Sequence, residues 1–219
     1  MFAVDRARVG DARGRGFGHR EPRRRYLPPV TRVTVGVAAI AASLAPLRRD
    51  KVGHRERAVF EAVNGLPDSL YTPAWAVMQL GTVGAAPAAA GAALLAGERR
   101  LAVRLLAGGV GAWAASKAVK RFAGRPRPIQ LLPDTHIRGQ EASGLGYPSG
   151  HAGVAVALGV AAFPYLGRRA RLAVALAIPT VGCTRMYVGA HLPLDIVSGA
   201  ALGLALDALV EWGGDRSRK

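Results

Sequence analysis

Long apolar blocks, rich in Ala, Val, Leu and Gly, alternate with short polar stretches along most of the chain. A helix needs about 20 apolar residues to cross the hydrocarbon core of a bilayer, and most of these blocks approach or exceed that length. The pattern therefore predicts an all-α fold, a polytopic membrane bundle of about six transmembrane helices. We place the six helices at residues 33–47, 73–97, 101–119, 152–166, 170–188 and 192–212.

Composition and charge divide the chain into three parts. Nine Arg fall within residues 1–32 without a sustained apolar stretch, which predicts a basic, disordered cytoplasmic tail. Residues 33–212 form the predicted membrane domain, and residues 213–219 form a second, short basic tail. The single cysteine, Cys183, excludes an intramolecular disulfide. With a net charge of +16 beside membrane helices, the chain favours anionic lipid over nucleic acid as a partner.

The alternation of the six segments puts the loops near 48–72, 120–151 and 185–191 on one face of the membrane. Eighteen of the thirty Lys and Arg lie nearer the opposite face. The positive-inside rule then predicts a multi-pass plasma-membrane protein with both termini in the cytoplasm and the three loops on the extracytoplasmic face. The rule does not explain the outer basic cluster at residues 48–57.

Three groups of polar residues lie at the ends of apolar segments, all on this predicted extracytoplasmic face. The first group runs from Lys120 to Arg127-Pro128. Basic residues also suit the end of a helix and the membrane interface, so this group alone does not indicate a site. A residue before proline is extended, however, so Arg127 is expected to lie away from the helix that carries Lys120.

The second group is Pro148-Ser149-Gly150-His151, at the start of the fourth segment. Ser149 is a suitable N-cap, and Gly150 lets an anion approach the free N–H groups of the first helical turn. The group therefore predicts phosphate binding. Taken in isolation, the tetrapeptide equally fits a capped helix with a surface histidine.

The third group joins the fifth and sixth segments and contains Thr184, Arg185, His191 and Asp195. His191 and Asp195 are four residues apart, so one helical turn brings the carboxylate beside the imidazole. A carboxylate that accepts from one ring nitrogen leaves the other nitrogen free to attack. The alternative is an ordinary acidic residue in a first helical turn.

Together the groups supply three cations, a hydroxyl, two histidines and one carboxylate. This set suits phosphoryl transfer, which depends on positioning and charge stabilisation. It lacks the carboxylate or histidine clusters of magnesium and zinc sites, so we predict neither a metal ion nor another cofactor. A Ser-His-Asp hydrolase is disfavoured because Ser149, as a helix cap, points at backbone donors.

The three groups, in this order, resemble the motifs of the type 2 phosphatidic acid phosphatase superfamily, which includes bacterial lipid phosphatases and the vanadium haloperoxidases. The family pattern is Lys, six residues, Arg-Pro; then Pro-Ser-Gly-His; then Ser-Arg, five residues, His, three residues, Asp. The chain matches it at Lys120, Arg127-Pro128, Pro148 to His151, Arg185, His191 and Asp195. It departs at Thr184, where the family usually has Ser; Thr keeps the hydroxyl, so we expect activity to survive.

The resemblance implies a role for each matched residue. His191 would attack phosphorus and form a phosphohistidine, with Asp195 orienting the ring. His151 would protonate the leaving oxygen and then activate water. The phosphate oxygens would be held by Lys120, Arg127, Ser149, Gly150 and Arg185.

The resemblance also implies a metal-independent membrane phosphatase. Its substrate would be a lipid phosphate or diphosphate of the polyprenyl diphosphate, phosphatidic acid or phosphatidylglycerol phosphate type. Two alternatives stay open: a polyprenyl-phosphoryl sugar phosphate of cell-wall synthesis as the substrate, and a non-catalytic membrane scaffold whose tail binds anionic lipid. The soluble haloperoxidases fit less well, because this chain consists mostly of membrane-length apolar segments. The sequence carries no signal for the oligomeric state.

Overall fold

The computed structural model describes residues 27–45, 47 and 51–216, and this part of the chain is helical without a strand. Most of the predicted basic tail, parts of the 48–57 cluster and residues 217–219 lie outside the described residues. In chain order the α-helices are α1 (Pro29–Leu44), α2 (His54–Asn64), α3 (Tyr71–Met78), α4 (Ala85–Leu95), α5 (Arg99–Ala123), α6 (Pro128–Leu131), α7 (Gly150–Ala162), α8 (Arg168–Tyr187) and α9 (Pro193–Arg216). Short 3-10 turns lie at η1 (Asp68–Leu70), η2 (Gln79–Gly81) and η3 (Phe163–Tyr165).

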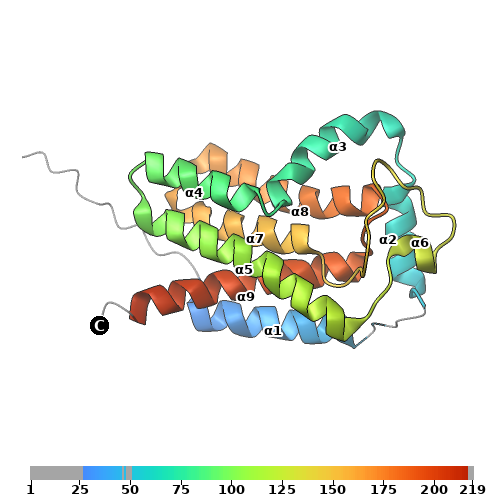
Figure 1. Cartoon of the computed structure of the whole chain (residues 1–219), viewed down its shortest axis with the longest axis horizontal. Helices are drawn as coiled ribbons and strands as arrows, with labels where there is room; N and C mark the ends of the chain where they lie inside the picture. The colour runs from blue at the N-terminus through green and yellow to red at the C-terminus, as the bar shows by residue number, and fades with distance from the viewer. Residues whose placement is uncertain (1–26, 46, 48–50, 217–219) are drawn as a thin grey trace, which may run out of the picture.

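The predicted helix at 73–97 is broken rather than continuous. Residues 68–81 and 85–95 are two helical stretches that meet at an angle of 68°. At the break, a Cβ on Gly81 would lie 2.7 Å from the carbonyl oxygen of His151, so only glycine lets the chain pass this close to the start of α7. The bend therefore brings α3 towards the end of the bundle where α7 begins (Figure 1).

One described helix, Pro193–Gly214, is long and apolar enough by itself to cross a membrane, and the bent pair would be a second such span. The helices α1 and α7 are apolar but shorter. The all-helical fold is thus as predicted, whereas the number of six transmembrane helices is not confirmed. A helix absent from the prediction, α2, lies in the 48–72 loop.

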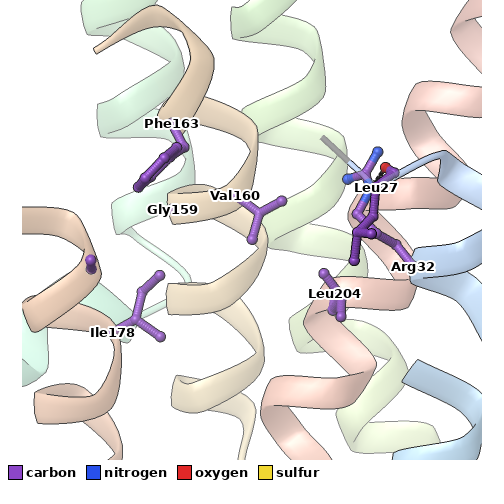
Figure 2. A pocket seen from close by; sticks show the side chains of 8 residues that line it. Leu27, Arg32, Gly159, Val160, Phe163, Ile178 and Leu204 are labelled. Carbon is purple, nitrogen blue, oxygen red and sulfur yellow. Dashed lines mark hydrogen bonds between the residues drawn. The ribbon is translucent and has the colours of Figure 1, made fainter. Parts of the chain in front are cut away.

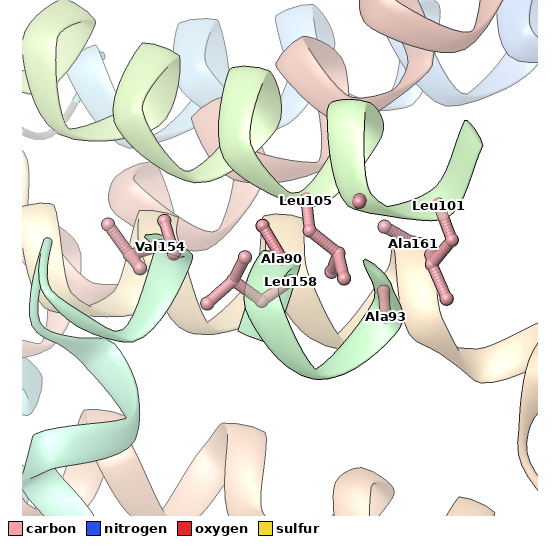
Figure 3. Close-up of a cluster of buried hydrophobic side chains, with 9 residues drawn as sticks. Ala90, Ala93, Leu101, Leu105, Val154, Leu158 and Ala161 are labelled. Carbon is pink, nitrogen blue, oxygen red and sulfur yellow. The ribbon is translucent and has the colours of Figure 1, made fainter. Parts of the chain in front are cut away.

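The interior between α4, α5 and α7 is filled by small side chains. Its cluster consists of Ala86, Ala90, Ala93, Leu101, Ala102, Leu105, Val154, Leu158 and Ala161 (Figure 3). A Cβ on Gly109 would lie 2.6 Å from the Cβ of Ala86, so α5 and α4 touch at close range. Close approach through small residues is typical of helix packing in membranes.

Figure 1 shows α2 and α6 at one end of the bundle and the end of α9 at the other. Buried polar contacts fasten the segment between α6 and α7 to this first end. Asn64, in α2, donates to the carbonyl oxygens of Met186 and Tyr187 at the end of α8. Arg138 donates to the carbonyl oxygens of Asn64 and Tyr187, each at 2.7 Å. The loops at this end are therefore fixed relative to the helices.

Candidate active site

All eight predicted site residues lie on the segments that meet at the α2 and α6 end of the bundle. Lys120 is near the end of α5, Arg127 immediately precedes α6, and Arg185 is near the end of α8. The segment Ser149-Gly150-His151 begins α7, while His191 precedes α9 and Asp195 lies in its first turn. These positions are separated by up to 75 residues in the chain, and the fold brings them to one region.

The histidine and aspartate of the third motif form the predicted pair. His191 Nδ1 lies 3.4 Å from Asp195 Oδ2, which also accepts the backbone N–H of Leu192 at 3.0 Å. His191 is 3% exposed and Asp195 is fully buried. An imidazole that donates from Nδ1 to this carboxylate has its Nε2 lone pair available for chemistry.

Arg127 lies against that second nitrogen. Its Nη1 is 3.4 Å from His191 Nε2 and donates to the carbonyl oxygen of Ala190 at 2.7 Å. Its Nε and Nη2 donate to the carbonyl oxygen of Ser143, at 3.2 and 2.9 Å. Burial lowers the pKa of Arg127, while Asp195 acts in the opposite direction; an arginine nevertheless stays charged in proteins. A positive charge is thus held beside Nε2.

The other two predicted cations keep donors for a ligand. The Lys120 ammonium donates to the carbonyl oxygens of Leu145 and Gly146, at 2.8 and 2.6 Å, which uses two of its three hydrogens. Arg185 is 8% exposed, its Nη1 contacts the sulfur of Met78, and its buried Nε has no hydrogen-bond partner among the described residues. Buried donors of this kind normally find an acceptor, so an anion at this position would satisfy them.

Ser149 is the N-cap of α7, as the sequence predicts. Its hydroxyl accepts the Ala152 N–H at 3.4 Å, and its own N–H donates to the Asp195 carbonyl oxygen at 2.8 Å. The side chain is fully buried, so in this structure the hydroxyl serves the helix. A Cβ on Gly150 would lie 2.9 Å from Ser116 Oγ, which explains why glycine follows the cap.

His151 and His191 face the same positive charges. Lys120, Arg127 and Arg185 all act electrostatically on both rings. For His191, which lies in the loop between α8 and α9, burial is the largest influence and the three cations add to it; together they hold its pKa well below the usual value. His191 is therefore a neutral imidazole at neutral pH, the form required of a nucleophile.

Two charged residues of the site were missed in the sequence analysis. Arg125, fully buried, donates from Nη1 to Asp195 Oδ1 at 3.0 Å and forms a forked pair with Glu56 at 2.9 and 2.7 Å. Arg125 falls in the unspecified stretch between Lys120 and Arg127, and Glu56 stands among the unexplained basic residues at 48–57. The sequence feature that could have drawn attention to Glu56 is its position as an acidic residue among basic ones.

The departure from the family pattern at Thr184 is accommodated locally. Thr184 is buried, and its hydroxyl donates to the Val181 carbonyl oxygen at 2.8 Å, within α8. The hydroxyl therefore satisfies the helix backbone, as serine and threonine commonly do in helices. The substitution leaves Arg185 in the site.

An apolar cavity of about 320 Å³ lies away from this site. It is lined by residues from the last turns of α7, the middle of α8 and α9, and the start of α1, and includes Gly159, Val160, Phe163, Ile178 and Leu204 (Figure 2). With Arg32 as its one charged lining residue, this cavity does not resemble a phosphate site. Among the described residues, no group of three or more His, Cys, Asp or Glu is placed to hold a metal ion.

A family model for the PAP2 superfamily matches residues 100–218, more than half of the chain and all eight predicted site residues. The chain belongs to the PAP2 superfamily. It is 35% identical over 145 residues to a decaprenylphosphoryl-5-phosphoribose phosphatase of Mycolicibacterium smegmatis, which covers 65% of this chain and 77% of the relative. A Mycobacterium tuberculosis protein of the same name is 32% identical over 130 residues, covering 58% of this chain and 70% of the relative.

Two solved structures share the fold. The transmembrane PAP2 type phosphatidylglycerolphosphate phosphatase of Bacillus subtilis superposes with a TM-score of 0.60 at 22% identity, over 87% of this chain and 97% of that one. Aquifex aeolicus LpxE gives a TM-score of 0.61 at 19% identity, over 71% and 93%. Family membership and these relatives identify this PAP2 protein as a phosphatase.

Proposed function

We propose that this PAP2-superfamily phosphatase hydrolyses a lipid phosphate through a phosphohistidine formed on His191. The carrying observation is the environment of His191 Nε2, which has the charged Arg127 guanidinium 3.4 Å away while Nδ1 faces a buried carboxylate. A phosphate drawn to Arg127 would stand next to the free ring nitrogen. Positioning and charge stabilisation of this kind are the main requirements of phosphoryl transfer.

In the proposed first step, His191 Nε2 attacks phosphorus and the bond to the leaving oxygen breaks. The negative charge of the bound phosphate offsets the three cations that face His151, so the ring holds a proton in the complex. The protonated ring donates to the leaving oxygen, while Arg127, Arg185 and Lys120 balance the charge on the remaining phosphate oxygens. In the second step, His151 takes a proton from water, which attacks the phosphohistidine and releases inorganic phosphate and free His191. We assign the backbone N–H group of Gly150 to the phosphate oxygens as well, together with the Ser149 O–H, because that hydroxyl accepts from Ala152 and its own hydrogen is a separate donor.

For the substrate, we propose a polyprenyl-phosphoryl sugar phosphate ahead of polyprenyl diphosphates, phosphatidic acid and phosphatidylglycerol phosphate. The support is that two relatives at 32–35% identity are named as decaprenylphosphoryl-5-phosphoribose phosphatases. All these lipids present a terminal phosphate to the same cations, so the distinction lies in the sugar and the chain.

We propose that the site opens on the extracytoplasmic face of the plasma membrane and that both termini are cytoplasmic. The positive-inside rule supports this orientation, because exposed arginines gather at the far end of the bundle, in the first turns of α5 and α8. These are Arg99, Arg100, Arg168, Arg169 and Arg171. Labelling of single cysteines placed in the loops, in intact cells and in inverted vesicles, would test it.

The test of the proposed function is phosphate release from this lipid panel in detergent with EDTA present. Wild-type protein is compared with His191→Ala and with His136→Ala, a matched control whose ring is 54% exposed and lies outside the three motifs. We expect EDTA-resistant release that His136→Ala keeps and His191→Ala loses. Release that needs added metal, or that survives His191→Ala, would contradict the proposed mechanism, and no release from any lipid would favour a scaffold.

A further inference from the structure

A second, largely covered carboxylate lies behind the proposed catalytic pair of His191 and Asp195. Glu56 lies in the first turn of α2 and is 9% exposed. It lies outside residues 100–218, the part of the chain that matches the family model. Burial of a charged side chain is costly unless it is paired, so the partners of Glu56 indicate what it does.

Glu56 has two partners, and both belong to the segments that carry the site. Arg125 donates to its two oxygens at 2.9 and 2.7 Å, which is the forked geometry that fixes both side chains. Glu56 Oε1 also accepts the backbone N–H of Leu194 at 3.1 Å. That N–H lies in the first turn of α9, where backbone donors lack partners within the helix. Glu56, which belongs to α2, thus caps the start of α9, and α9 begins two residues after His191.

Arg125 joins this carboxylate to Asp195. The same Nη1 that contacts Glu56 donates to Asp195 Oδ1 at 3.0 Å, while Asp195 Oδ2 faces His191. The chain of contacts therefore runs from Glu56 through Arg125 and Asp195 to the His191 ring. Every side chain in it is at most 9% exposed, so water screens these charges weakly.

We propose that Glu56 and Arg125 are positioning residues that set the orientation and the charge of Asp195 and, through it, the reactivity of His191. The inference rests on the proposed function. Its physical basis is twofold: the Glu56 cap fixes how α9 begins, and hence where His191 stands, and the Glu56 charge offsets that of Arg125. Without this offset, the full Arg125 charge would act on Asp195 and weaken its hold on the His191 Nδ1 proton. His191 Nε2 would then be a poorer nucleophile.

This role differs from that of a plain ion pair between helices. Paired charges in a protein interior contribute little net stability compared with well-packed apolar residues. A plain pair would affect the fraction of folded protein and not the rate at which folded molecules react. In metal sites, mutating the residues that orient a ligand from behind typically costs about 10- to 100-fold in activity, and we expect an effect of the same order here.

The test uses Glu56→Gln, which keeps the shape and can still accept hydrogen bonds from Leu194 and Arg125 but removes the charge. The matched control is Glu61→Gln on the same helix, because Glu61 is 58% exposed and its ion pair with Arg57 is 3.7 Å long. Arg125→Lys is a second variant, which keeps the charge but loses the planar fork that holds Glu56 while contacting Asp195. It tests the chain of contacts from Glu56 to Asp195 if Glu56→Gln does not fold. The substrate is a ³²P-labelled form of the lipid phosphate that wild type hydrolyses fastest in the panel. Full-length protein is mixed with it in detergent, and the reaction is quenched in alkali, in which phosphohistidine survives.

The readout is the single-turnover rate constant of phosphoenzyme formation at several substrate concentrations. A rate constant does not depend on the fraction of folded enzyme, which sets only the amplitude. We expect the maximal rate constant to fall about 10- to 100-fold in Glu56→Gln and Arg125→Lys. The concentration giving half the maximal rate should change less than about threefold, because Lys120, Arg127 and Arg185 are untouched, and Glu61→Gln should match wild type.

Two results would overturn the proposal. One is a rate constant within about twofold of wild type in both variants, with only the amplitude or the melting temperature reduced. The other is slowing in Arg125→Lys with wild-type rates in a folded Glu56→Gln, which would remove Glu56 from the positioning role. Phosphate release that survives His191→Ala is a different result, because it contradicts the proposed function itself.

Discussion

Helix α9 carries two fully buried aspartates, Asp195 and Asp207, and their surroundings differ in a way that suits one to the proposed catalysis and the other to holding helices together. The two residues are twelve positions apart, which is about 18 Å along a helix. Asp195 lies at the end of the bundle that holds the site, and Asp207 lies towards the other end. Both contact arginines from other segments, so burial and ion pairing alone do not distinguish them.

Asp207 belongs to a group of two acids and two arginines that pair with one another, which we call the closed cluster. Arg104 donates to both of its oxygens at 2.6 and 2.7 Å, and Arg32 contacts both Asp207 and Glu211. Arg104 also pairs with Glu211 at 3.0 Å. This set joins α1, α5 and α9, and its formal charges cancel.

Asp195 belongs to a group in which the cations outnumber the acids, which we call the open cluster. It contacts Arg125 and His191, and beyond His191 stand three further cations with no acid paired to them among the contacts that the structure describes. The neutral His191 ring therefore lies near cations that still have hydrogen-bond donors to offer. Ionisable residues within membrane helices are commonly functional, but here only the cluster with unmatched charge and spare donors is suited to bind an anion.

The sharpest test of the comparison is the same substitution at both aspartates. Asp195→Asn should lower kcat by about 10⁴-fold, because an amide cannot hold the His191 tautomer as a carboxylate does. Asp207→Asn should leave kcat per folded molecule within about threefold of wild type. Phosphate release normalised to the amount of folded protein measures both, and equal losses at the two positions would contradict the comparison.

The next test removes the spare donors. Arg185→Lys keeps a positive charge but loses the buried Nε and the fork, so kcat/KM should fall about 10²- to 10³-fold. Arg168→Lys, an exposed arginine at the start of α8, is the matched control on the same helix. Steady-state kinetics on the preferred lipid would measure the change. A loss below about threefold would mean that Arg185 does not hold the phosphate.

At the other end, the expected effect is on stability. Asp207→Asn leaves Arg32 and Arg104 with Glu211 as their remaining acid, and breaking a buried pair of this kind costs about 3–5 kcal/mol. Thermal unfolding in detergent should therefore show a lower Tm than for wild type. Asp68→Asn is a suitable control, because Asp68 also pairs with an arginine but is 68% exposed. An unchanged Tm in Asp207→Asn would show that the closed cluster does not hold the helices together.

The smallest expected effect is a pH dependence. Because burial and the neighbouring cations lower the pKa of His191, its ring stays neutral as the pH falls through 6.5, where an ordinary histidine would gain a proton. Protonation of the His191 ring should thus lower kcat/KM only well below pH 6.5, and a change between pH 8 and 6.5 should follow His151 or the substrate phosphate instead. Suppose that kcat/KM shows an acidic limb centred near pH 6.5, and that this limb persists when each of the other histidines is replaced. That result would contradict the neutral, buried state of His191.

Local sequence patterns predicted much of the fold and nearly all of the candidate site. Membrane-length apolar blocks predicted an all-helical chain, and the order of three motifs predicted the family, which the comparisons confirm along with a lipid phosphatase function. The His191–Asp195 contact was predictable because it follows from the four-residue spacing of one helical turn. The Ser149 cap was predictable for the same reason, since capping is local.

Other features depended on contacts between distant segments. The break at Gly81 was not predicted, because the residue looks ordinary in an apolar block and becomes informative only where α7 passes within van der Waals range. Glu56 and Arg125 are separated by 69 residues, and nothing near either one in the sequence names the other as its partner.

The sequence by itself determined which residues could do phosphate chemistry, because residue type, spacing and helix geometry act over a few positions. Only the tertiary structure decided how the charges are matched. Helix packing pairs the charges around Asp207 with one another and leaves the cations around His191 without acids among the described contacts. It also links Glu56 to Asp195 through Arg125. The physical reason is that the energy of a buried charge depends on its neighbours in space, and helix packing rather than chain order decides those neighbours.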